Sequence, residues 1–208
     1  MGSAVQPELV ARAKSVIREE MIRVRGGLSD FERIEKSRQI ARRLFELEVF
    51  RKSEAIFFFL SLPEEVQTED MIREAFRLNK EVFVPLVDKE EGRLQVVRIP
   101  HLEIEFVRGE YGVQEPASQW REISSPARLD LVVAPGLAFD ASGGRIGYGV
   151  GYYDRLLKRI PAEAVRVGVG FDFQVLNSIP RMDFDMPVQF VITETQSLTC
   201  SGLPGAEG

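Results

Sequence analysis

The chain is poor in the residues that build disulfides and histidine-rich metal sites. Cys200 is its only cysteine and His101 its only histidine. One cysteine cannot form an internal disulfide, and one residue of each type cannot build a cysteine-rich zinc site or a histidine cluster. The metal chemistry that remains open is that of carboxylates, which favours magnesium.

The sequence also lacks a basic excess and long apolar runs. Its 208 residues carry 27 basic and 32 acidic side chains, a balance that argues against a nucleic-acid partner. No segment reaches the roughly 18 apolar residues that span a bilayer, and the first twenty residues show no signal-peptide pattern. We therefore expect a cytoplasmic protein that does not bind membranes, with a monomer as the default state.

Short apolar runs alternate with amphipathic segments along the chain. Because 44% of the residues are hydrophobic, the length suits one sizeable core, and we expect a single domain over 1–199 with a flexible tail at 200–208. Strands are predicted at 55–60, 81–87, 94–99, 129–135 and 165–171. The alternation of strands and helices predicts an α/β fold, a mostly parallel sheet flanked by helices. The segment 103–128 is expected to be a long irregular connection.

Two helices are predicted before the first strand. Pro7 suits the first turn of a helix that Gly26 and Gly27 end, and Ser29 with Glu32 forms a capping-box pattern for the next. Thr68 is the predicted N-cap of a third helix. Apolar residues of the second helix recur at helical spacing: Phe31, Ile34, Ala41 and Leu44.

A glycine-rich stretch, GGRIGYGVGYYDRLL at 143–157, follows the strand at 129–135 and precedes a predicted helix. Ligands of open α/β sheets bind at the carboxyl ends of the strands, and glycines let backbone amides and the helix start approach an anion. Arg145 offers a planar cation for phosphate oxygens, and Asp154 could hold a magnesium ion. The alternative is a flexible linker. Neither of the two standard nucleotide loops is present, because G-x-x-x-x-G-K-[ST] is absent and Asp154 replaces the third glycine of G-x-G-x-x-G.

The first helix carries a row of basic residues. Lys14, Arg18 and Arg25 fall along one flank of its apolar stripe. This row either reaches over the core into a cleft or forms a solvated flank.

Acidic and aromatic residues elsewhere are less specific. Glu65 follows the strand at 55–60, where it either faces a ligand or serves a helix dipole. Asp183 and Asp185 could complete a metal site. The three tyrosines of the glycine stretch either stack on a heterocycle or pack the helix.

The stretch PGLAFDASGGRIGYGVGYYDRLL resembles the 5-formyltetrahydrofolate cyclo-ligase family, whose pattern is P-x-L-x-F-D followed by R-[LI]-G-x-G-x-G-Y-Y-D. Three further pieces agree in order. Lys14 and Arg18 match an amino-terminal K-x-x-x-R, FLSLPEEVQT resembles the family's strand followed by E-[IV]-x-T, and YGVQEP precedes the glycine stretch. The resemblance covers roughly residues 10 to 195.

This resemblance implies a fold like that of ribose-phosphate isomerase and CoA-transferase. It also implies a reaction, the ATP- and Mg²⁺-dependent cyclisation of 5-formyltetrahydrofolate to 5,10-methenyltetrahydrofolate with release of ADP and phosphate. The formyl oxygen would be phosphorylated and so become a good leaving group. Lys14, Arg18 and Arg145 would carry the catalytic charge stabilisation.

The resemblance also implies the remaining site residues. Metal ligands would be Asp154 and Asp185, and folate would face Leu60, Glu65, Tyr148 and Tyr152. ATP would bind Lys14, Arg18, Arg145, Ile146, Gly147, Tyr148, Gly149, Val150, Gly151, Tyr152 and Tyr153.

The chain departs from the family pattern at three positions. Phe184 precedes Asp185 where relatives often have histidine, Gln189 replaces an often acidic residue, and Val150 replaces a glycine of some relatives. Asp183 therefore stays a competing metal ligand. Two other functions are weighed: a non-catalytic folate or nucleotide binder, and a phosphotransferase acting on a sugar or CoA ester.

Overall fold

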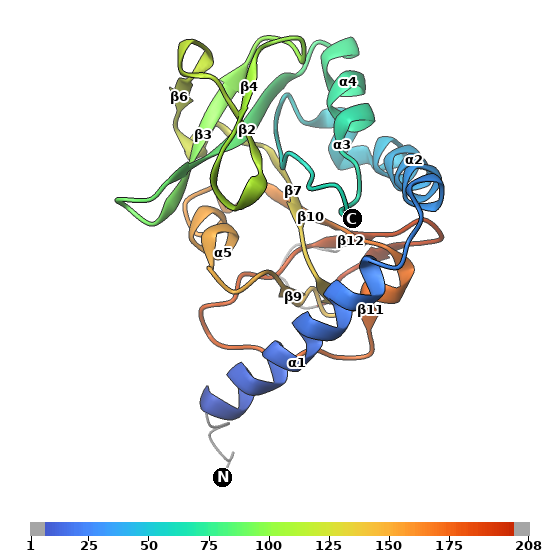
Figure 1. Cartoon of the computed structure of the whole chain (residues 1–208). Helices are drawn as coiled ribbons and strands as arrows, with labels where there is room; N and C mark the ends of the chain where they lie inside the picture. Colours follow the sequence, from blue (N-terminus) through green and yellow to red (C-terminus); the bar gives the residue numbers. More distant parts are fainter. Residues whose placement is uncertain (1–6, 202–208) are drawn as a thin grey trace.

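An eight-stranded sheet forms the centre of the protein, whose computed structural model describes residues 7–201 (Figure 1). The strand order is β13-β12-β10-β7-β1-β2-β3-β6. These strands are β1 (Ala55–Phe58), β2 (Glu81–Asp88), β3 (Arg93–Ile99), β6 (Glu122–Ser124), β7 (Leu131–Pro135), β10 (Val165–Val169), β12 (Phe190–Ile192) and β13 (Ser197–Thr199). Neighbours from β12 to β2 run parallel, whereas β13, β3 and β6 pair antiparallel. The predicted mostly parallel α/β sheet is confirmed, and each of the five predicted strands forms.

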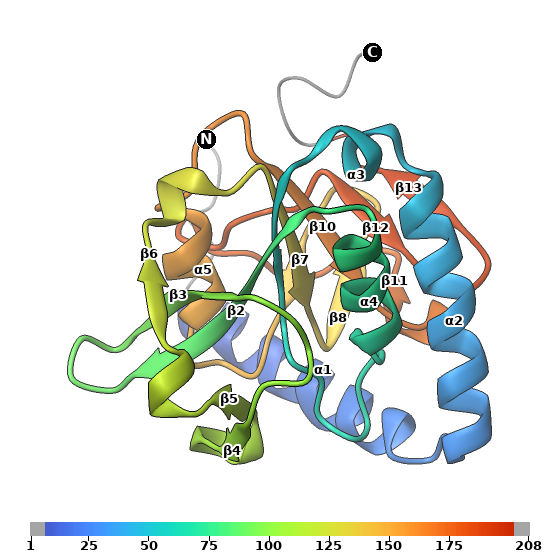
Figure 2. The same ribbon diagram turned by 90° about the horizontal axis from the view of Figure 1, so that it is seen from above.

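Helices cover both faces of this sheet (Figure 2). One face carries α2 (Asp30–Glu46), α3 (Glu48–Lys52) and α4 (Glu69–Arg77), and the other carries α5 (Tyr152–Leu157). No helix within residues 7–201 is long and apolar enough to cross a membrane.

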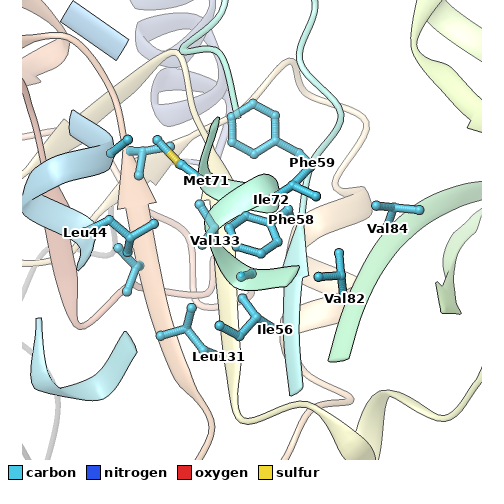
Figure 3. Close-up of a cluster of buried hydrophobic side chains, with 14 of the residues drawn as sticks. Leu44, Ile56, Phe58, Phe59, Met71, Ile72, Val82, Val84, Leu131 and Val133 are labelled. Atoms are coloured by element: carbon cyan, nitrogen blue, oxygen red, sulfur yellow. The ribbon is translucent and has the colours of Figure 1, made fainter. Parts of the chain in front are cut away.

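The residues of β1 explain why both faces are covered. Ile56 and Phe58 point to one face, where they lie in one cluster with Leu44 of α2 (Figure 3). Phe57 points to the opposite face and packs with Leu156 of α5. Each such buried side chain contributes about 1.5–3 kcal/mol of transfer free energy. An unbroken apolar run is therefore what this central strand requires.

A second, three-stranded sheet supports the glycine-rich stretch. Its strands are β8 (Ala138–Asp140), β9 (Arg145–Ile146) and β11 (Val175–Leu176), in the order β11-β8-β9. The helix α1 (Pro7–Arg25) lies along this sheet, with Met21 packed against Leu137 and Ile146 (Figure 1). The amino-terminal helix is thereby fixed beside the glycine loop.

The predicted start of α2 is confirmed, but its predicted apolar face is partly wrong. The α2 capping box is present, because Ser29 Oγ accepts the Glu32 amide at 3.2 Å and the Glu32 carboxylate accepts the Ser29 amide at 3.0 Å. The predicted apolar face is wrong at its start, since Phe31 is 75% and Ile34 42% exposed. Phe31 lies about 180° around the helix axis from the buried Ile40.

Two connections also differ from the prediction. Thr68 occupies the N-cap position of α4, but its hydroxyl donates to the carbonyl of Phe59 at 2.7 Å instead of capping the helix. The segment 103–128 is not wholly irregular, because β4 (Phe106–Arg108) pairs with β5 (Gln114–Pro116) and β6 extends the main sheet. Strands of three residues are too short to show a periodicity in the sequence. The short helix α3 was not predicted either.

Cys200 belongs to the core and not to a tail. It is fully buried and packs with Phe139, Val188 and Val191. Burial, and next the nearby Asp140 carboxylate, raise the pKa of its thiol to about 11. Its placement in the predicted tail is thus wrong, and the rest of that tail, 202–208, lies outside the described residues.

Candidate functional site

A narrow crevice lies where three parallel strands end. It has no room for a water molecule as it stands, and it is lined by Arg25, Phe59, Glu65, Val66, Pro135, Gly136, Val169 and Gln174. From β1 the chain moves to β2 on one side of the sheet and later to β7 and β10 on the other. The border between β1 and β7 is therefore a topological switch point, the place where open α/β sheets bind ligands.

The glycine loop needs glycine at specific positions. Gly143, Gly149 and Gly151 have φ angles of +85°, +104° and +76°, in the region that side chains disfavour. A Cβ on Gly143 would lie 2.3 Å from the carbonyl oxygen of Val188. The loop is thus held close to the segment that leads into β12. The following helix, α5, has only six residues, so the predicted contribution of a helix start is small.

Asp140 fixes the turn from which this loop begins. Its carboxylate accepts the hydroxyl and amide of Ser142 and the amides of Gly144 and Ile179, and it pairs with Arg181 at 2.9 Å. Burial opposes its charge, but these hydrogen bonds outweigh burial and hold its pKa below the ordinary value. The last residue of the P-x-L-x-F-D run is therefore a structural anchor of the loop.

Arg145 and Asp154 form an ion pair across the loop. Arg145 Nη2 donates to Asp154 Oδ1 at 2.9 Å, and the Arg145 side chain is only 3% exposed. Its guanidinium also lies 5.6 Å from the centre of the Tyr153 ring, while its Nε has no partner among the described residues. A buried cation with a spare donor suits an anionic ligand.

Lys14 and Arg18 reach this loop from α1. Lys14 donates to Asp185 Oδ2, which also accepts the amide of Met182 at 2.7 Å. Arg18 Nε donates to the carbonyl of Gly147 at 2.8 Å. The basic row is therefore directed at the glycine loop and its neighbour segment, and the alternative of a solvated flank is wrong for these two residues.

The two aspartates predicted as metal ligands are connected through the backbone of Met186. Asp154 Oδ1 accepts a hydrogen bond from the amide of Met186 at 3.0 Å, and Met186 directly follows Asp185 in the sequence. Hydrogen bonds within residues 7–201 engage only Oδ1 of Asp154 and only Oδ2 of Asp185. One oxygen of each remains for a cation. The competitor Asp183 is exposed and has no such neighbour among the described side chains.

This pair fits magnesium better than a metal held by protein alone. The described residues contain no group of three or more His, Cys, Asp or Glu side chains placed to hold a metal ion. Magnesium is typically bound by one or two carboxylates together with water and substrate phosphates. Two adjacent aspartates beside a row of cations match that arrangement.

Glu65 and Tyr148 meet around Arg25, at the carboxyl end of α1. Arg25 Nη2 donates to the Tyr148 hydroxyl, and its Nη1 lies 3.7 Å from Glu65 Oε1. Glu65 Oε2 accepts the amide of Leu62 at 3.0 Å. Burial of the carboxyl raises the pKa of Glu65 to about 7, and the charge of Arg25 opposes this rise. Desolvation, and next the Glu65 carboxylate, raise the pKa of Tyr148 to about 12, so its hydroxyl stays protonated at neutral pH.

Two further tyrosines of the glycine stretch make aromatic contacts. Tyr152 packs edge-on against Tyr111 with ring centres 6.1 Å apart, and Tyr111 is 63% exposed with a φ of +55°. Tyr153 is directed into the core against Phe57, and burial raises its pKa. Leu60 is half-buried at the edge of the same core. A flat apolar ligand could therefore contact Tyr152 and Tyr111.

The structure brings the predicted residues together in two groups. Two cations and two aspartates form one connected set, Lys14, Asp185, Asp154 and Arg145, while Arg18 contacts the middle of the loop at Gly147. Glu65 and Tyr148 form the second group, around Arg25. Ile146 is buried against α1 and so offers only its backbone, while Val150 is exposed.

Sequence reasoning missed three contributors to the site. Asp140 was noted only as the last residue of the P-x-L-x-F-D motif. Arg25 was noted as part of the basic row, but no function was predicted for it. Tyr111 lies in a segment with no periodic pattern. The spacing of Arg25 from Lys14 and Arg18 on one helix was the signal that could have found it.

Known proteins resemble this chain over most of its length. Residues 10–194 match the model of the 5-formyltetrahydrofolate cyclo-ligase family. The 5-formyltetrahydrofolate cyclo-ligase of Mus musculus is 31% identical over 193 residues, covering 89% of this chain and 95% of its own. The NMR structure of Aquifex aeolicus 5,10-methenyltetrahydrofolate synthetase is 32% identical with a TM-score of 0.79, covering 94% and 96% of the two chains. A Mycoplasma pneumoniae 5,10-methenyltetrahydrofolate synthetase, 19% identical over 87% of this chain and 98% of its own, shares the fold with a TM-score of 0.68.

Proposed function

Because this chain belongs to the 5-formyltetrahydrofolate cyclo-ligase family, we propose that it catalyses the ATP- and Mg²⁺-dependent cyclisation of 5-formyltetrahydrofolate to 5,10-methenyltetrahydrofolate. The observation that carries the proposal is the arrangement around the glycine loop. Lys14 and Arg145 are linked through the two aspartates, Arg18 contacts the loop at Gly147, and Glu65 lines the switch-point crevice beside Arg25.

The cationic end of the loop suits the phosphates of ATP. Lys14 and Arg145 are nearly buried, with 7% and 6% exposure, so their charges act in a poorly solvated place. Each is paired with one of the two aspartates. Binding of a magnesium–nucleotide complex would exchange these partners, with phosphates taking the cations and the metal taking the carboxylates. Because every buried charge keeps an opposite charge as partner during this exchange, binding leaves no buried charge unpaired.

Asp154 and Asp185 would hold the magnesium ion through their remaining oxygens. A bound magnesium ion would neutralise negative charge on the nucleotide phosphates. The chain's own residues then position the nucleotide: Arg18 fixes the loop through the Gly147 carbonyl. The loop amides would hold the transferring group in line.

The surroundings of Glu65 suit a reduced pterin. Such a ring presents N–H donors at one edge and a flat face. The Glu65 carboxyl lies in the crevice and can accept from such donors. Tyr152, which is packed edge-on against Tyr111, would offer a face for stacking, and Tyr148 lies beside Glu65 through Arg25.

The chemistry explains why both ends must be occupied together. The formyl oxygen attacks the γ-phosphorus, and the bond from that phosphorus to the ADP oxygen breaks. Nitrogen 10 then attacks the formyl carbon and loses its proton, and the carbon–oxygen bond breaks to release inorganic phosphate. Arg145 and Lys14 would offset charge that develops on the transferring phosphoryl group, which is the larger part of catalysis in such reactions.

A non-catalytic folate or nucleotide binder would use the same site without turnover. The two functions separate when ADP is measured alongside the folate product. The enzyme predicts one ADP for each methenyl product and no ADP without 5-formyltetrahydrofolate. Binding of both ligands with no ADP would select the binder instead. The cytoplasmic location and the monomeric state stay predictions.

A further inference from the structure

Arg25 is a buried cation that lies against both Glu65 and Tyr148, where we propose that the folate binds. It is the last residue of α1 and is only 2% exposed. Its Nη2 donates to the Tyr148 hydroxyl and lies 3.4 Å from Glu64 Oε1, while its Nη1 faces Glu65 Oε1 at 3.7 Å. Its Nε has no partner among the described residues. Burying a charged pair adds little stability compared with apolar packing, so stability alone explains this arrangement poorly.

The geometry around Glu65 depends on Arg25 more than on any other described cation. One carboxylate oxygen of Glu65 is fixed by the Leu62 amide, and the other faces the guanidinium. The same guanidinium lies 5.6 Å from the centre of the Tyr148 ring and contacts its hydroxyl. A planar fork can therefore set both groups at once, which a flexible ammonium cannot do.

We propose that Arg25 is a positioning residue, which orients the Glu65 carboxylate and the Tyr148 hydroxyl toward the folate. This inference rests on the proposed function. Arg25 lies on the same helix as Lys14, about 16 Å further along its axis. One rigid helix thus sets the cation of the nucleotide end and the cation of the folate end.

The groups that face Glu65 make the proposal testable by pH. The charged and titratable ones are Arg25, Glu64, Tyr148 and Tyr153, and Arg25 is the cation among them. The Glu65 pKa lies near 7 with Arg25 in place, and it rises further when that charge is removed. Folate binding that needs the carboxylate would then require a higher pH.

Arg25→Met tests the role, since it keeps the length of the side chain and removes its charge. We expect a rise of tenfold or more in the KM for 5-formyltetrahydrofolate, with the Kd for ATP within twofold of wild type. The pH midpoint of folate binding, measured by calorimetry, should rise by one unit or more. Arg25→Lys should restore the pH midpoint but not the full affinity, because it returns the charge without the fork. Arg23→Met, on the same helix with a 71% exposed side chain, is the matched control.

The outcomes separate this inference from the proposed function. Turnover by the wild-type protein tests the proposed function whatever the role of Arg25. If Arg25→Met lowers ATP and folate affinity equally, or leaves the pH midpoint unchanged, Arg25 is a structural residue and the inference is wrong. If Arg25→Met does not fold, two milder variants test the inference instead. Tyr148→Phe keeps the aromatic ring, and Arg25→Lys keeps a cation. Unchanged folate affinity in these two variants would overturn the inference.

Discussion

Arg145 and Asp154 pair at 2.9 Å across the glycine loop, although sequence analysis gave one to phosphate and the other to metal. The pair brings the predicted phosphate-binding cation and a predicted metal ligand into direct contact. Lys14 and Asp185 repeat the relationship from α1 and from the segment before β12. Four charged residues from three parts of the chain therefore form one neutral group.

Arg145→Ala should impair catalysis strongly. Loss of a preorganised cation at a transferring phosphoryl group costs about 3 kcal/mol, or roughly 150-fold in kcat/KM. Lys158→Ala, at an exposed position at the end of α5, should leave the kinetics unchanged. Steady-state kinetics with both substrates measure the effect. A loss below threefold in folded protein would show that Arg145 does not act on the phosphoryl group.

Asp185→Asn should release Lys14 from its ion pair. Without metal, ATP should then bind several-fold more tightly, because phosphate no longer competes with the carboxylate for this cation. In the presence of Mg²⁺ the gain should vanish, since a metal ligand is lost. Calorimetry with and without a chelator measures both affinities, and Asp183→Asn is the exposed control. Identical metal-free affinity in wild type and Asp185→Asn would refute the exchange of partners.

Glu65 should make the protein less stable as pH rises. Its pKa of about 7 in the folded state exceeds the ordinary 4.5, so the folded protein binds the extra proton between these values. Stability contributed by the protonated form is thus present below about pH 4.5 and is lost by about pH 7, a change of roughly 3 kcal/mol.

Urea unfolding of Glu65→Gln tests this linkage. The variant should lose that pH dependence and should exceed wild type in stability at pH 8. Glu91→Gln, at an exposed turn, should keep the wild-type dependence. Parallel pH curves for wild type and Glu65→Gln would contradict a raised Glu65 pKa.

Gly143→Ala should destabilise the protein more than Gly92→Ala. Both glycines have positive φ, +85° and +58°, so both variants bear a backbone cost of about 1–2 kcal/mol. Only Gly143 is also confined, with the Val188 carbonyl 2.3 Å from a Cβ, whereas nothing lies within 4 Å of a Cβ at Gly92. We expect a further loss of about 2 kcal/mol for Gly143→Ala. Equal unfolding midpoints for the two variants would show that the loop is free to move.

The sheet could be predicted from sequence because its central strands are unbroken apolar runs. Ile56 and Phe57 face helices on opposite sides of the sheet. Because both faces of β1 are buried, its sequence is apolar throughout, and this pattern can be recognised without a structure. Phe31 shows the limit of the same reasoning. It was grouped with Ala41 and Leu44, but at about 100° per residue it lies about 180° from the buried Ile40 and so falls outside the face that meets the sheet.

The site was partly predictable for a similar reason. Glycines and charged residues in one short stretch indicate a phosphate loop, and helical spacing placed Lys14 and Arg18 together. The sequence could not show that Arg25 meets Glu65 and Tyr148, since these contacts join segments far apart in the chain. Tyr111 was hidden in the same way.

The most direct test of the proposed activity is the absorbance of the methenyl product. Purified protein is incubated with 5-formyltetrahydrofolate and Mg²⁺, with and without ATP, in wild-type and Arg145→Ala forms. We predict a rise that requires ATP and that is nearly abolished in the variant. A flat trace from folded wild-type protein with ATP would contradict the proposed reaction.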